Sequence, residues 1–95
     1  MKIYWPYKSD KPDKKYYIIT KSGKKIYFGA AGYSDFTKHK DEERKNRYIL
    51  RHEKNESKFW NNSGVDTASF WMRFYLWEKP TKKQAYENIK TRSLK

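Results

Sequence analysis

The sequence predicts a small α+β fold in which a β-hairpin precedes three helices, in the order ββααα. Two segments rich in Tyr, Ile and Phe, Lys15–Thr20 and Lys25–Ala30, flank a Lys-Ser-Gly-Lys turn at 21–24. Ser-Gly between two such segments is a hairpin signal. Helical patterns with recognisable start signals then fill most of residues 40–92. At 95 residues, the chain has a common size for one domain, so we expect a single domain over 1–95.

The segment before the hairpin, residues 1–14, opens with an extended-type stretch, Ile3–Tyr7, that contains Pro6. Proline has no backbone N–H to donate, which keeps it out of central strands. We therefore expect residues 1–14 to form either an edge strand or an extended arm.

The first predicted helix, Lys40–Lys54, begins with acidic residues and ends with basic ones, which suits the helix dipole. Five of its cations are spaced four, three, four and three residues apart. Each helical residue turns the chain by about 100°, so they project within an arc of roughly 80°. No acidic residue enters this arc; Ile49 lies opposite it, with Tyr48 and Leu50 on the flanks. The basic stripe consists of Lys40, Arg44, Arg47, Arg51 and Lys54.

Capping residues predict two further helices. Asp66 can cap the first of them, which is expected to run through Trp77 and to end before Pro80. Thr81 and Gln84 have the spacing of a capping box and are expected to start the other helix, Thr81–Arg92. The 66–77 segment is apolar nearly all round, so it must be covered on most sides. We interpret it as core plus the interface of a homodimer; a ligand pocket is the alternative.

The composition favours a folded, strongly basic protein. Only 36% of the residues are hydrophobic, but 19% are aromatic, and each buried aromatic removes a large area from water. The net charge of +12 favours a polyanionic partner, most often nucleic acid. Two alternatives remain open for the stripe: ordinary surface pairs such as Glu43 with Arg47, and arginines lying flat over the core.

The sequence predicts no catalytic or metal centre. The two histidines, His39 and His52, are far apart and no cysteine is present, so zinc-finger spacing is missing. Tyr27-Phe28-Gly29 loosely resembles half of a GIY-YIG nuclease signature, without the other half. We expect no enzyme activity and no cofactor, with a nuclease as a minor alternative. The chain shows no apolar run of membrane-spanning length and no signal-peptide core, so we expect no membrane partner.

Four long motifs lie within the stretch from Lys15 to about Ile89, at Phe28–Asp35, His39–Arg44, Arg47–His52 and Leu76–Thr81. They resemble a family of small basic proteins of uncharacterised function from nucleocytoplasmic large DNA viruses, including the Marseillevirus group. The resemblance implies a viral, non-enzymatic and DNA-associated virion component, and it carries no catalytic residues. It places the protein in the virion, and in the host cytoplasm or nucleus during infection.

These observations together predict a sequence-independent DNA-binding protein that neutralises or packages viral DNA. The stripe is expected to contact phosphates of double-stranded DNA, with a salt slope of about −4 to −5 for roughly five contacts. The footprint is extended by Lys24, Lys25, Lys82 and Lys83. The alternative is a protein-interaction adaptor that docks an acidic host or virion partner through an aromatic hot spot at Phe59–Trp60.

Overall fold

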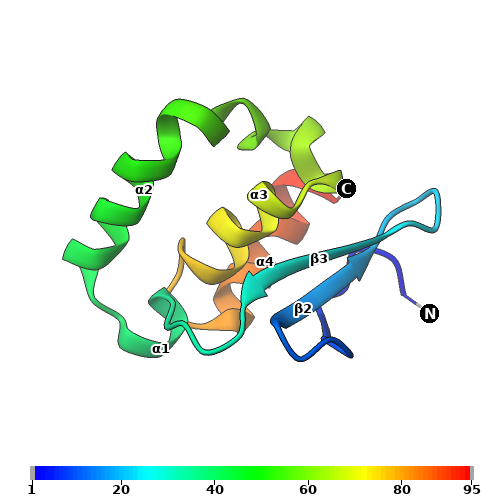
Figure 1. Cartoon of the computed structure of the whole chain (residues 1–95). Helices are drawn as coiled ribbons and strands as arrows, with labels where there is room; N and C mark the ends of the chain where they lie inside the picture. The colour runs from blue at the N-terminus through cyan, green and yellow to red at the C-terminus, as the bar shows by residue number, and fades with distance from the viewer. Residues whose placement is uncertain (1, 95) are drawn as a thin grey trace. The chain divides into compact units, whose positions relative to one another are not determined.

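The computed structural model describes residues 2–94, which divide into two compact units (Figure 1). The first unit extends to Tyr33 and the second begins at Ser34. A small antiparallel sheet forms the first unit and helices form the second, which confirms the α+β class.

The first unit is a three-stranded antiparallel sheet in the order β1-β2-β3. Its strands are β1 (Tyr7–Lys8), β2 (Lys14–Ile19) and β3 (Lys25–Ala30). Strand β1 pairs with β2 alone and is therefore an edge strand directly after the buried Pro6.

The hairpin between β2 and β3 confirms the predicted pair of strands. Gly23 supplies the left-handed backbone of the turn, with φ of 89°, a conformation that costs a glycine little. The Thr20 hydroxyl accepts a hydrogen bond from the Lys24 N–H at 3.2 Å and so ties the turn to the end of β2. In the register of the pair, Ile18 lies opposite Ile26.

The two faces of this sheet differ. On one face Ile18 and Phe28 are fully buried. On the other, three tyrosines stand directly opposite one another on the three strands, with Tyr17 in the middle. Its ring centroid lies 5.5 Å from that of Tyr7 and 5.4 Å from that of Tyr27. The Lys25 ammonium lies 4.7 Å from the Tyr17 centroid, a cation–π contact.

The second unit contains four α-helices, where three helices were predicted for the whole chain. In chain order its elements are α1 (Phe36–His39), α2 (Glu42–Glu56), η1 (Ser57–Phe59), η2 (Asn62–Asp66), α3 (Ala68–Trp71), η3 (Met72–Leu76) and α4 (Lys82–Ser93). Both η1 and η2 are 3₁₀ turns, and η3 is a π-helical turn that continues α3. The turn η3 packs against α4, and Figure 1 shows α2 (green) along the outside of the unit.

The boundaries of two predicted helices were wrong. The first begins at Glu42, because Lys40 takes a left-handed conformation with φ of 53° and ends α1. The second was predicted to start at Asp66. Instead Thr67 caps α3, because its hydroxyl accepts a hydrogen bond from the Phe70 N–H at 3.3 Å. The third prediction is confirmed, since Thr81 caps α4.

The aromatic segment supplies the core of the second unit and is buried in the single chain. Phe70, Trp71 and Leu76 are at most 1% exposed, as are Ala85 and Ile89 of α4. The core positions of this segment are thus covered within the single chain, and the homodimer stays a prediction.

Candidate functional site

Helix α2 carries most of the predicted basic stripe, and its ends explain why it forms where it does. The Asp41 carboxylate accepts hydrogen bonds from the N–H groups of Glu43 and Arg44, at 3.0 and 3.3 Å. These donors have no partner within the helix, so the cap satisfies them. Glu42 and Glu43 in the first turn and Lys54 in the last turn complement the helix dipole.

The rotation of α2 about its axis is fixed by one aromatic stack. The Tyr48 ring, only 3% exposed, lies parallel to the Trp77 indole, with centroids 4.4 Å apart and planes 2° apart. The His52 ring packs on Tyr48, with centroids 4.3 Å apart. Burial raises the pKa of the Tyr48 phenol well above its ordinary range, so it stays neutral. Because Tyr48 faces inward, the stripe on its flank faces solvent.

Polar contacts hold the second half of α2. His52 Nδ1 lies 2.5 Å from a Glu56 carboxylate oxygen. The other oxygen of Glu56 accepts a hydrogen bond from the Ser69 hydroxyl at 2.7 Å. The Trp60 indole N–H in turn donates to the Ser69 oxygen at 3.0 Å. Trp60 is thus a half-buried packing residue, held by a hydrogen bond rather than presented to a partner.

The segment after Trp77 is also tied to α2. The Lys45 ammonium donates to the Glu78 carbonyl oxygen at 2.9 Å. Arg73 Nη1 donates to the Glu78 carboxylate at 2.5 Å. Burial alone raises the pKa of the Glu78 carboxyl, but the hydrogen bond and positive charge of Arg73, with the charge of Lys45, outweigh it and hold that pKa below its usual range.

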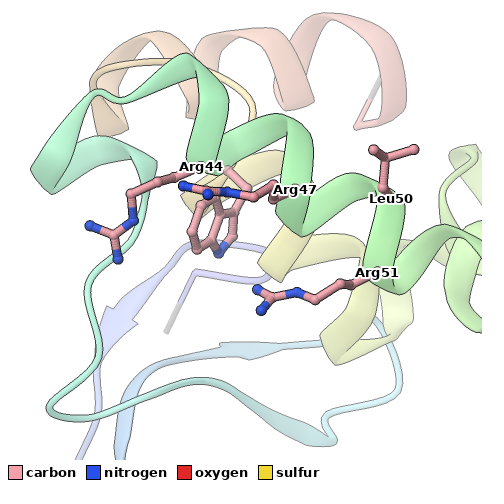
Figure 2. A pocket seen from close by; sticks show the side chains of 5 residues that line it. Arg44, Arg47, Leu50 and Arg51 are labelled. Atoms are coloured by element: carbon pink, nitrogen blue, oxygen red, sulfur yellow. The ribbon is translucent and has the colours of Figure 1, made fainter.

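Three arginines of α2 line one open cavity of about 460 Å³ (Figure 2). Its lining residues are Arg44, Arg47, Leu50, Arg51 and Trp77. Figure 2 shows the three labelled arginine side chains extending to the same side of α2, while Leu50 projects in another direction. Leu50 is 72% exposed and is the exposed large apolar residue of α2. We call this set of five residues the arginine cavity.

Among residues 2–94, no acidic side chain lines the arginine cavity, so the charged groups of its lining are all positive. Arg47 has an ion-pair partner in Glu43 at 3.8 Å, but both side chains are more than half exposed, so solvent screens this pair. Among residues 2–94, no ion pair neutralises Arg44 or Arg51. Their guanidinium groups are free to take an anion.

The structure brings together the central part of the predicted stripe and separates its ends. Arg44, Arg47 and Arg51 share the arginine cavity, whereas Lys54 lies in the last turn of α2 and does not line it. Lys40 was wrongly placed on the helix. It lies in the connection between α1 and α2, where its ammonium donates to the Thr37 carbonyl oxygen at 3.1 Å.

The other predicted cations lie on other elements. Lys24 and Lys25 belong to the turn and to β3 of the first unit, and the Lys25 ammonium is 3.5 Å from the Asp10 carboxylate. Lys82 and Lys83 occupy the first turn of α4, away from the lining of the arginine cavity.

Sequence reasoning missed Leu50 and Trp77 as members of the site. Leu50 was detectable as a large apolar residue on an otherwise charged helix flank. Trp77 gave no such signal, because only folding brings this residue against Tyr48. Among the described residues, no group of three or more His, Cys, Asp or Glu is arranged to hold a metal ion. None of the helices built from those residues combines the length and the apolar character that crossing a bilayer requires.

Comparison with protein families gives a match over part of the chain. Residues 7–52 match a family of unknown function (DUF5754). No curated protein and no solved structure matches the chain. The matched residues include the whole sheet and α2 through His52, and they stop before Trp77. The chain is therefore similar to this family over just under half of its length. The matched segment contains all three arginines of the cavity.

Proposed function

We propose that this protein binds double-stranded DNA without sequence preference, through the exposed flank of α2. The observation that carries the proposal is the convergence of Arg44, Arg47 and Arg51 on one cavity that has no acidic lining residue. Guanidinium groups present forked donors that match phosphate oxygens, and unneutralised ones favour a polyanion. The net charge of +12 adds long-range attraction to the same class of partner.

We further propose that the DNA is viral and that the protein neutralises or packages it in a virion. Support comes from the resemblance of Phe28–Asp35, His39–Arg44 and Arg47–His52 to basic proteins of large DNA viruses. Contacts to phosphate alone carry no sequence information, which suits a packaging role. Lys54, Lys82 and Lys83 are exposed or half-exposed cations of the second unit that would extend the footprint. Lys24 and Lys25 are exposed cations of the first unit and would add phosphate contacts of their own.

The test is charge reversal of the arginine cavity, with Arg44→Glu, Arg47→Glu and Arg51→Glu combined. These side chains are exposed and make no buried contact, so the variant should keep the wild-type circular dichroism spectrum. A matched control, Lys38→Glu, Lys58→Glu and Lys90→Glu, makes the same change in net charge at exposed positions outside the cavity. Affinity for a duplex is measured by gel shift across a salt series.

The cavity variant should lose duplex binding at physiological salt, and its salt slope should become shallower by about 2 to 3 units, since three phosphate contacts are removed. The control should retain most of the duplex affinity and most of the salt slope. If the two variants lose affinity equally, the attraction is a general effect of charge and α2 is not the binding face. Sedimentation of the wild-type protein alone tests the predicted homodimer in the same preparation.

The adaptor function has less support. Its predicted hot spot is packed, because the Trp60 indole N–H is bound to Ser69 and the Arg73 guanidinium lies 5.4 Å from the Trp60 ring centroid. Leu50 is the exposed apolar residue of α2, and it lies in the arginine cavity instead.

A further inference from the structure

The arginine cavity combines two kinds of chemistry that a simple phosphate-tracking stripe does not need. Three arginines line it, together with two apolar residues, Leu50 and Trp77. Its volume of about 460 Å³ lies within the ~300–1,000 Å³ range of pockets that hold small ligands. A ligand that fits carries concentrated negative charge next to an apolar group.

We propose that the arginine cavity takes the terminal nucleotide of a DNA strand that ends in a phosphate monoester. This inference rests on the proposed function and narrows it. A terminal phosphate carries close to two negative charges near neutral pH, whereas each phosphate within a strand carries one. Three arginines that converge on one space therefore favour the end over the interior of a strand.

The two apolar lining residues determine how the nucleotide is oriented in the cavity. The Trp77 indole is only 8% exposed, and its ring is held in the stack with Tyr48, so it cannot open to stack on a base. Leu50 lines the cavity and is largely exposed, so it offers aliphatic contact at the rim to a sugar or to the edge of a base. The terminal nucleotide thus enters phosphate first, between the arginines, with its sugar against Leu50. A nucleotide inside a strand has neighbours on both sides and enters such a space less readily.

The experiment compares two duplexes of identical sequence, one with 5′-phosphate ends and one with 5′-hydroxyl ends, in direct titration. Closed circular plasmid, which has no ends, serves as the competitor. The wild-type protein should bind the phosphorylated duplex about tenfold more tightly, the gain expected for one additional strong charge-assisted hydrogen bond. Circular plasmid should compete poorly for this tighter binding.

Three variants sharpen the test. Leu50→Ser should reduce the preference for phosphate ends, measured as the ratio of the affinities for the phosphorylated and the unphosphorylated duplex. The triple cavity variant should abolish the preference, and the Lys38, Lys58 and Lys90 control should preserve it. Circular dichroism confirms that each variant is folded.

Each result has one meaning. If the wild type binds both duplexes with equal affinity, and the cavity variant loses binding to both, the terminal-phosphate inference is overturned. The proposed DNA binding then stays in place. Absence of binding to every duplex and to plasmid overturns the proposed function itself. Tighter binding of a phosphoserine peptide than of the phosphorylated duplex also overturns the inference, because the cavity then serves a protein ligand.

Discussion

His39 lies between aromatic rings and a cation. Its ring centroid is 5.3 Å from that of Trp77, and its Nε2 atom is buried without a hydrogen-bond partner among the described residues. Its Nδ1 accepts a hydrogen bond from the Asp41 N–H at 3.0 Å, which requires an unprotonated nitrogen there. Burial, and then the charge of Arg44, lower the pKa of His39 below its ordinary value of 6.5, although Asp41 and Asp35 oppose this.

We therefore predict that the second unit loses stability as the solution becomes acidic. A histidine whose pKa is lower in the folded state binds its proton preferentially in the unfolded state. The stabilising effect is complete above pH 6.5 and is lost as the pH falls through the folded-state pKa. Urea midpoints measured from pH 7.5 to pH 5 should fall for the wild type and fall less for His39→Gln, which keeps a neutral acceptor. Equal slopes for the two proteins would contradict a role for His39.

At the scale of an element, the start of α2 decides how the arginines are presented. Asp41→Ala removes the acceptor for two N–H groups and should cost about 1 kcal/mol of unfolding free energy. Asp41→Asn keeps a good cap and is the matched control. Chemical denaturation measures both. An alanine variant as stable as the asparagine variant would show that the Asp41 cap contributes nothing to the stability of α2.

The elements also show how far sequence reasoning extends. The hairpin and α4 were predictable because their signals are local, a Ser-Gly turn in one and a Thr81 cap in the other. The start of α2 was missed because the cationic periodicity includes Lys40, although capping by Asp41 excludes it. Gly64 likewise gave no signal: a Cβ atom there would lie 1.8 Å from the Phe59 carbonyl oxygen, a closeness visible only after folding.

At the scale of the whole molecule, the sequence predicted the basic character and the class of fold, but not the division into two compact units. Each unit has its own aromatic cluster. The first contains Tyr7, Tyr17 and Tyr27, and the second contains the stack of Tyr48 on Trp77. Of the candidate site, the three arginines were predictable from helical spacing. The contribution of Trp77 to the cavity was not predictable, because it depends on contact between segments that are distant in the chain.

The position of Trp77 makes the protein its own optical reporter. Of the four tryptophans, it is the one that lines the arginine cavity, so a ligand there must alter the electric field around its indole. Tryptophan emission should change in intensity or wavelength when a phosphorylated duplex is added, and it should saturate with the binding isotherm. Trp77→Phe preserves an aromatic partner for Tyr48 and should silence this change. An unaltered wild-type spectrum at saturation would place the nucleic acid on a different face, without any need for a label.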